Sequence, residues 1–389
     1  MRQAALLLFC LALPISIAGT NIGAGLLCVL ILLAALKGRD PGWKRLRNPA
    51  ILGLALYCAA ALIAAWAGLD PRSSLKLLPK DLHKLWLVAV LLLALGEEPR
   101  KDHPLLLRAL AAGFALIALV GLGQVALGQD ASGQWARAHA WVHPVTYGEQ
   151  LALALLGALC FFDRPEAETS SPAAKRWDWA FILLAAAALV LNQTRGALLG
   201  LAAGFAAVCR FDARLRRRSL WALAAAVAIV VLWELLPFDR SLLSLFSAAS
   251  PDNPHQMRWA LWKTAVAIFR DHPWTGAGPG RYHDLFELYH PGPLREDVWG
   301  SAHNLYLHQL AERGLLGLTA LGAALGTLTL RAYRRCAAAA TPWNLWAFGS
   351  CAAFLAMSLT EVTFQNEQAT SLFLFIWAWA ERSHKAVAG

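Results

Sequence analysis

The amino-acid sequence predicts an all-α membrane protein that crosses the bilayer many times. Its side chains are 58% apolar and 15% charged, and its mean hydropathy is +0.47. Apolar runs of roughly 15 to 25 residues follow one another from Met1 to Ala380, which is the pattern of consecutive membrane spans. This composition excludes a soluble globular enzyme and a disordered chain.

Hydropathy and helix breakers together predict about twelve transmembrane helices in a single integral membrane domain, residues 1–389. An even number of spans places both termini on one side of the membrane. The first span resembles a signal peptide, but a second apolar run follows after Thr20-Asn21, which favours an anchor. The predicted spans are 4–19, 22–36, 49–68, 83–95, 104–128, 145–162, 179–192, 196–209, 219–237, 303–330, 343–360 and 366–380.

The distribution of basic residues predicts that both termini are cytoplasmic. With Met1 inside, cytoplasmic segments hold 21 of the 35 Lys and Arg residues and exterior segments hold 12. The segment 210–218 alone contains five arginines, which would be unusual outside. The net charge of +10 therefore reflects orientation, and no nucleic-acid partner is expected. The seven cysteines lie in apolar runs or in loops expected inside, so neither disulfides nor a cysteine zinc site is predicted.

One exterior segment, residues 238–302, is much longer than the other loops and rich in tryptophan. Within it, residues 257–271 have helical periodicity, and Arg258 shares the apolar face of that helix with Trp262. The arginine either extends toward lipid headgroups or faces a protein cavity that holds an anion.

Arg195 lies in the middle of the apolar residues 177–209, with about 14 apolar residues on either side. The charge distribution requires two spans joined at this arginine. Each span is roughly 21 Å long, against a hydrocarbon thickness near 30 Å, which places the turn below the exterior surface. An arginine at that depth indicates a functional site, unless tilt or bilayer thinning brings the turn to the interface.

His303 is expected in the first turn of a helix that Ser301 caps and that continues without a break to about Leu330. The residue would then project just above the lipid, as a capping or surface residue or as a general base. His308 lies about 140° away around the helix, so the two histidines cannot share a metal ion.

Two further motifs lie on the exterior side. The run Gly276-Ala277-Gly278-Pro279-Gly280 does not have the spacing of a nucleotide-binding loop, and tight turns are the expected use of its glycines. Arg137, His143 and Glu149 lie near the exterior start of the span 145–162. Each either faces the same site as the two arginines or is a solvated or interfacial residue.

In their order along the chain, these motifs resemble the O-antigen ligase family (WaaL), which belongs to a larger group with the Wzy polymerases and the bacterial O-oligosaccharyltransferases. The resemblance covers about residues 140–380. It rests on four motifs, which are Thr194-Arg195-Gly196, Arg258-Trp259, the 276–280 run followed by Tyr282, and His303-Asn304 with Leu307. Residues 1–140 contain no matching motif, so the site of acceptor recognition stays open.

The resemblance implies a glycosyltransferase of C-type membrane architecture in the bacterial inner membrane, active at the periplasmic face in lipopolysaccharide biosynthesis. Such an enzyme transfers polysaccharide from undecaprenyl diphosphate to the lipid A core by inversion, without metal or cofactor. Residues 238–302 would then form a large periplasmic loop between the ninth and tenth spans. Arg195 and Arg258 match the essential arginines of the family, and His303 matches its essential histidine.

The residues themselves agree with that chemistry, because arginines stabilise a leaving diphosphate and a neutral histidine accepts a hydroxyl proton. Arg137 and His143 are further substrate-binding candidates. A Wzy-type polymerase would use the same charged groups, and the oligosaccharyltransferase branch carries a longer C-terminal portion. A lipid or polysaccharide transporter is a third alternative, although no repeated halves are visible. The sequence does not indicate the donor sugar or the oligomeric state.

Overall fold

The computed structural model describes residues 1–96, 103–128, 137–162, 172–217, 254–290 and 300–382. All regular secondary structure in these ranges is helical. The helices are α1 (Arg2–Ala12), α2 (Ile17–Leu36), η1 (Trp43–Leu46), α3 (Pro49–Ala67), α4 (Pro71–Leu75), α5 (Leu78–Gly96), α6 (His103–Ala126), α7 (Pro144–Phe161), α8 (Pro172–Asn192), α9 (Arg195–Cys209), α11 (Pro254–Asp271), α12 (Arg281–Tyr289), α13 (Leu305–Ala338), α14 (Pro342–Met357), η5 (Thr363–Gln365) and α15 (Glu367–Arg382).

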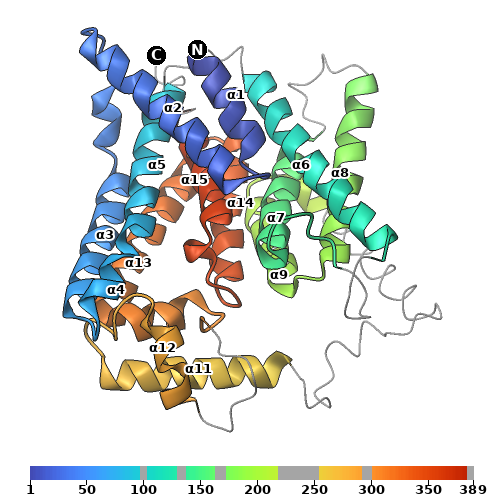
Figure 1. Cartoon of the computed structure of the whole chain (residues 1–389). Helices are drawn as coiled ribbons and strands as arrows, with labels where there is room; N and C mark the ends of the chain where they lie inside the picture. Colours follow the sequence, from blue (N-terminus) through green and yellow to red (C-terminus); the bar gives the residue numbers. More distant parts are fainter. Residues whose placement is uncertain (97–102, 129–136, 163–171, 218–253, 291–299, 383–389) are drawn as a thin grey trace, which may run out of the picture.

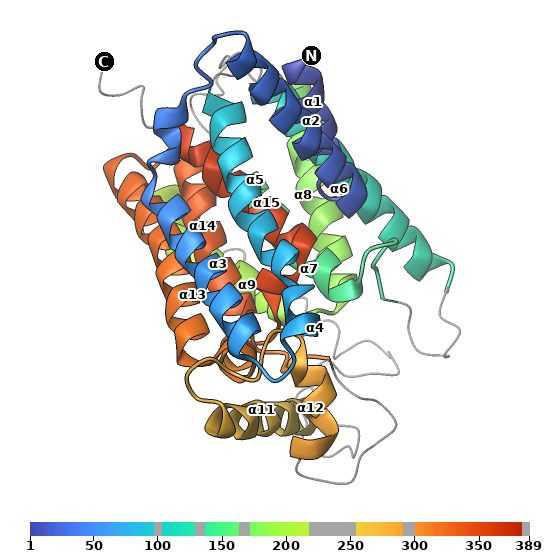
Figure 2. The same cartoon turned by 60° about the vertical axis from the view of Figure 1, so that its left-hand side comes forward.

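Most of these helices run side by side in one bundle, with the start of α1 and the end of α15 at the same end (Figures 1 and 2). Helices α11 and α12 lie across the opposite end. Helix α15 forms the centre of the bundle, and every residue from Gln368 to Ala380 is buried. Because α15 is surrounded by other helices, its apolar side chains pack against protein and not against lipid.

The predicted polytopic helical architecture is confirmed in its main feature. Every predicted span except 219–237 falls on a helix, and 219–237 lies outside the described residues. Five of the described helices are each long and apolar enough to cross a membrane, and α1 and α9 are apolar but shorter. The five are α2, α3, α6, α7 and α13. The number of twelve spans and the C-type architecture stay predictions.

The boundary between the first two helices was predicted wrongly. Thr20 and Asn21 lie inside α2, and the break falls earlier, at residues 13–16. Ser16 is the N-cap of α2, and its hydroxyl accepts a hydrogen bond from the Gly19 amide at 3.2 Å. A serine cap after Pro14 is a stronger start signal than the polarity of Thr-Asn, because it satisfies a backbone N–H of the first turn.

Helix α13 is broken at Gly314, contrary to the prediction of a continuous helix. Gly314 has φ 60° and ψ −160°, a conformation that only glycine adopts readily. The break frees backbone groups on both sides, and the segment 273–278 pairs with them. The amides of Ala277 and Gly278 donate to the carbonyls of Ala311 and Glu312, both at 2.9 Å.

The glycine run therefore makes tight turns, as the sequence predicts, against the broken helix. Gly276, Gly278 and Gly280 all have positive φ. A Cβ atom at Gly276 would lie 2.3 Å from the Arg313 amide nitrogen. Only glycine permits so close an approach of two backbones, so this run fixes the position of the first half of α13.

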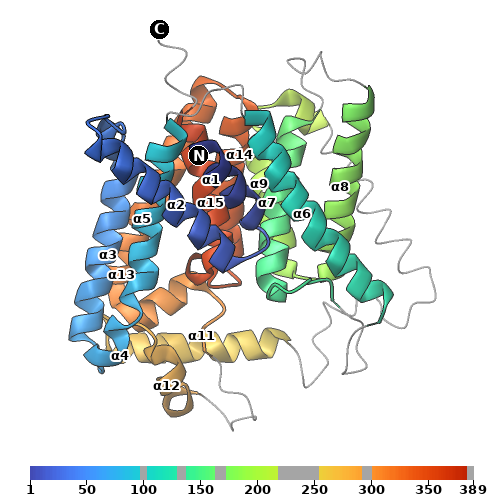
Figure 3. The same ribbon diagram turned by 45° about the horizontal axis from the view of Figure 1, so that its top comes forward.

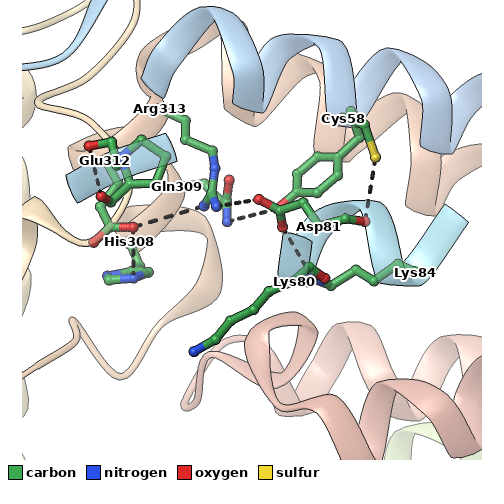
Figure 4. A network of polar contacts seen from close by, with 11 residues as sticks. Cys58, Lys80, Asp81, Lys84, His308, Gln309, Glu312 and Arg313 are labelled. Carbon is green, nitrogen blue, oxygen red and sulfur yellow. Dashed lines mark hydrogen bonds and ion pairs between the residues drawn. The ribbon is translucent and has the colours of Figure 1, made fainter. Parts of the chain in front are cut away.

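Arg313, at the break, lies in a buried network of charges between α3, α5 and α13 (Figure 4). Its Nη2 atom contacts Asp81 Oδ2 at 2.8 Å, and Asp81 also accepts from Lys84 and Tyr57, each at 3.1 Å. On the other side, Glu312 lies 3.4 Å from the buried His308. Buried charges are tolerated here because each is paired with an opposite charge. Removing one partner of a buried pair typically lowers the free energy of unfolding by about 3 to 5 kcal/mol.

We expect Gly314→Ala to destabilise the protein by about 2 to 4 kcal/mol. The new Cβ would meet the Trp274 carbonyl at 2.5 Å, and the backbone would be strained as well. Thermal unfolding of the purified protein in detergent measures the effect. Gly322→Ala is the matched control, because it lies on the same helix with no neighbour within 4 Å. Equal unfolding temperatures for the two variants would contradict this account of the break.

Helices α11 and α12 have a small hydrophobic core of their own. It consists of one face of α11, two aromatic residues of α12 and parts of the chain around the start of α13. Tyr282 is at its centre, and its hydroxyl donates to the Leu261 carbonyl at 2.9 Å. This core holds the α11 helix against the end of the bundle. Its members are Leu261, Ala265, Ile268, Ala277, Tyr282, Phe286, Ala302 and Ala311.

Candidate active site

Glu361 joins two of the three residues that the sequence singles out. It lies between α14 and η5, and its side chain is only 8% exposed. One carboxylate oxygen, Oε1, accepts a hydrogen bond from Arg258 Nη2 at 3.0 Å, and Oε2 lies 2.7 Å from His303 Nδ1. The arginine of α11 and the histidine before α13 therefore meet at a single carboxylate, although 103 and 58 residues separate them from it.

His303 precedes α13 and does not lie in its first turn, which corrects the prediction. The N-cap is Asn304 and not Ser301, because the Asn304 side chain accepts from the Leu307 amide at 3.1 Å. Asn304 also donates to the Leu359 carbonyl at 3.0 Å. Asparagine caps as well as serine does, and here it also anchors the loop. His303 itself has φ 44°, a left-handed conformation that is uncommon outside glycine.

The loop that carries Glu361 is fixed from the interior of the bundle. Glu149, a buried residue of α7, accepts from the Thr363 hydroxyl at 2.7 Å and from the Asn366 amide at 2.9 Å. The Ser358 carbonyl accepts from the Leu305 amide at 2.9 Å. These bonds hold the loop at both ends, so the carboxylate of Glu361 is presented on a rigid support.

Arg258 lies on the side of α11 that faces the protein. Leu261, Ala265 and Ile268 on that side are buried, whereas Lys263 and Arg270 are exposed, as the helical periodicity predicts. The arginine is about one quarter exposed, at 28%. Its ion pair with Glu361 places the guanidinium against the protein, as the cavity-facing alternative predicts.

Arg195 begins α9, directly after a turn that separates it from α8. Gln193 in that turn has φ 59°. Arg137 fixes the turn, because it donates to the Asn192 carbonyl and to the Thr194 hydroxyl, both at 2.9 Å. The predicted division of residues 177–209 into two helices at Arg195 thus agrees with the structure.

Gly196 brings the start of α9 against the loop of Glu361. A Cβ atom at this position would lie 2.3 Å from the hydroxyl oxygen of Thr360. The Arg195 guanidinium is half-buried here, and it is close enough to Arg258 for the two positive charges to repel each other. Two guanidinium groups at one place indicate a site for a multiply charged anion.

His143 is the residue before α7, at the edge of this cluster. Burial lowers the pKa of its imidazole, and Arg137 and His303 lower it too, whereas Glu361 acts in the opposite direction. These effects favour the neutral form of His143, and they show that its imidazole is within electrostatic range of the cluster. The structure thus brings Arg137, His143, Arg195, Arg258 and His303 together around Glu361.

One family model matches part of the chain. Residues 180–322 match the family model described as O-antigen ligase (Wzy_C). This match supports the O-antigen ligase family. The matched segment contains the two arginines and the histidine named above, whereas Glu361 lies outside it. Members of this group are glycosyltransferase-like membrane enzymes, so a multi-pass membrane enzyme of ligase or polymerase type is the assignment that the match supports.

Two other comparisons add little. No curated protein matches the chain. One solved structure, titled "Structural coordination of polymerization and crosslinking by a peptidoglycan synthase complex", is similar over 87% of this chain and 98% of that chain. The identity is 18% and the TM-score is 0.47, a likeness too weak to assign a shared activity.

Sequence reasoning did not single out Glu361. It falls in the connector between the predicted spans 343–360 and 366–380, where an acid is ordinarily a solvated loop residue. The predicted topology could have indicated it. The connector that contains Glu361 is predicted to lie on the exterior side of the membrane, as Arg195 and His303 are. Among the residues that the structure describes, no group of three or more His, Cys, Asp or Glu is arranged to hold a metal ion.

Proposed function

We propose that this protein is an O-antigen ligase, which transfers polysaccharide from undecaprenyl diphosphate to the lipid A core at the periplasmic face of the inner membrane. The observation that carries the proposal is the shared carboxylate. Glu361 orients a histidine on one oxygen and an arginine on the other, next to a second arginine. A base and an anion-binding pair are thus combined at one end of a membrane bundle.

The lipid diphosphate is the part of the substrate that the arginines suit. No nucleotide supply is available outside the inner membrane, so the donor must already carry its leaving group. As the bond between the anomeric carbon and the diphosphate oxygen breaks, its electron pair moves to that oxygen. Arg195 and Arg258 offer planar N–H forks to the growing negative charge, which lowers the barrier of this step.

His303 is proposed as the general base. The 2.7 Å contact of Nδ1 with the Glu361 carboxylate favours the tautomer with the proton on Nδ1 and the lone pair on Nε2. Nε2 takes the proton from the acceptor hydroxyl while the hydroxyl oxygen attacks the anomeric carbon from the side opposite the diphosphate. The new glycosidic bond therefore has inverted configuration. The products are the extended acceptor, a lipid diphosphate and a protonated histidine.

The remaining residues position these groups. Arg137 is proposed to hold the α8–α9 turn so that Arg195 faces the diphosphate, since two of its nitrogens already bind that turn. His143, which is exposed at the edge of the cluster, is proposed to contact a sugar hydroxyl or the diphosphate. The periplasmic orientation follows from the predicted excess of Lys and Arg at the opposite face.

A reconstituted reaction tests the function. The purified protein is mixed with undecaprenyl-diphosphate-linked polysaccharide and lipid A core, without added ATP. We expect a covalent polysaccharide–lipid A core product. Elongation of the lipid-linked polymer by a further repeat unit would identify a polymerase instead, and a lack of any covalent product would favour the transporter alternative.

We expect Arg195→Lys to reduce transfer by at least about 100-fold, because one ammonium group cannot reproduce a planar, bidentate contact. The rate of product formation in the reconstituted reaction measures the effect. Arg270→Lys is the matched control, since Arg270 is exposed on α11 and faces away from the cluster. Full activity of Arg195→Lys would refute bidentate binding of the diphosphate.

A further inference from the structure

A charged cavity lies at the end of the bundle opposite Glu361, the end that Figure 3 turns toward the viewer. Its volume is about 390 Å³, and it is enclosed by residues 44–49 and the ends of α5, α13 and α15. Among the described residues, five cationic side chains and one carboxylate line it. These are Lys44, Arg45, Arg47, Arg331, Arg382 and Glu381.

Glu381 is the one carboxylate among the described residues that line this cavity. Glu381 is shared by two arginines, because it forms ion pairs with both Arg331 and Arg335. The Arg335 side chain is only 4% exposed, and its Nε and Nη2 atoms have no hydrogen-bond partner among the described residues. Cationic side chains thus outnumber carboxylates among the described residues of the lining and next to it, which favours binding of an anion.

The cavity wall is rigid and polar on one side. Arg45 Nη2 donates to the Gly96 carbonyl at 2.9 Å, which ties the segment before α3 to the end of α5. Asn48 caps α3 by accepting from the Ala50 amide at 3.0 Å. Neither contact uses the head groups of Lys44 and Arg47, which are both exposed at the rim.

The cavity is apolar on its other side, where Leu92, Leu95 and Ala378 contribute to the lining. Trp43, next to the rim, is 46% exposed, and tryptophan is enriched at the membrane–water interface. A cationic rim beside an apolar wall, at the ends of membrane helices, matches a lipid headgroup and its first acyl carbons better than it matches a free ion.

We propose that this cavity binds the phosphate headgroup of an anionic phospholipid. The lipid would belong to the leaflet opposite the catalytic cluster, which the predicted orientation makes the cytoplasmic one. The proposal does not depend on the glycosyltransferase activity, because it concerns residues at the other end of the bundle. In this site, arginine and lysine side chains would contact the phosphodiester of the lipid. The acyl chains would extend along the outer surface of the helices.

Binding of phosphatidylglycerol to the full-length protein in detergent, followed by native mass spectrometry, tests the proposal. We expect Lys44→Gln combined with Arg47→Gln to weaken this binding about 30-fold, since each cation near a membrane surface contributes roughly a factor of five. Charge reversal with Lys44→Glu and Arg47→Glu should weaken it further. Phosphatidylethanolamine, which is zwitterionic, should bind weakly to all variants.

The matched control is Arg214→Gln combined with Arg217→Gln, which removes the same charge from two exposed residues predicted on the same side. Phosphatidylglycerol binding should stay within about twofold of wild type. The proposal is overturned if both double variants lose binding equally or if neither does. Release of the lipid by millimolar inorganic phosphate would also overturn it, because the site would then recognise a free anion.

Discussion

We expect His303→Ala to lower polysaccharide transfer by about 10² to 10⁴-fold, the usual contribution of a general base. The alanine removes the only proton acceptor that the proposed mechanism gives to the incoming hydroxyl. It also leaves Glu361 bonded to Arg258, so the ion pair of the cluster persists. The variant should therefore still bind the lipid diphosphate donor, and the loss should appear in kcat and not in the KM for the donor.

The reconstituted reaction measures this loss under saturating donor and acceptor. His283→Ala is the matched control, because His283 is exposed on α12 at the same end of the bundle. That variant should transfer at the wild-type rate. Wild-type-like transfer by His303→Ala would remove His303 from the mechanism, provided that both variants elute from gel filtration as wild type does.

The sequence predicted those parts of the structure that depend on local patterns. The face of Arg258 follows from helical periodicity, because residues three and four positions apart share one side of a helix. The turn at Arg195 follows from the charge distribution, which does not allow a single helix between residues 177 and 209. Both inferences use constraints that act within about twenty residues.

Features that depend on contacts between distant segments could not be predicted in this way. The break at Gly314 occurs because the segment 273–278 supplies partners for the freed backbone groups, and nothing around Gly314 itself indicates those partners. The cap at Asn304 was missed for a similar reason. Its amide is anchored by the Leu359 carbonyl, 55 residues away, whereas Ser301 is an equally good local signal.

Glu361 makes the most consequential of these distant contacts. We expect Glu361→Gln to lower kcat about 10⁴-fold. The amide is nearly the same size as the carboxylate, but it can present its NH₂ group to His303 Nδ1. The histidine would then carry its proton on Nε2, where the mechanism needs a lone pair. Losses of this order are typical when the carboxylate that orients a catalytic histidine is removed.

The KM for the donor distinguishes this positioning role from a merely structural one. Glu361→Gln removes a negative charge beside Arg258, so binding of an anionic diphosphate should stay unchanged or improve. A general loss of structure would instead raise the KM and lower the unfolding temperature. Glu367→Gln is the matched control, since Glu367 accepts from Asn21 at 2.7 Å in the same part of the chain and lies outside the proposed mechanism.

Glu361→Asp separates the two oxygens of the shared carboxylate. The side chain is shorter by one methylene, so it cannot reach both His303 and Arg258 without a shift of the loop that Glu149 holds. If catalysis needs only the bond to His303, Glu361→Asp should keep that bond and lose the contact with Arg258. Its kcat should then be higher than that of Glu361→Gln. A kcat for Glu361→Asp no higher than that of Glu361→Gln would show that a carboxylate at this position must hold the base and the anion-binding arginine at the same time.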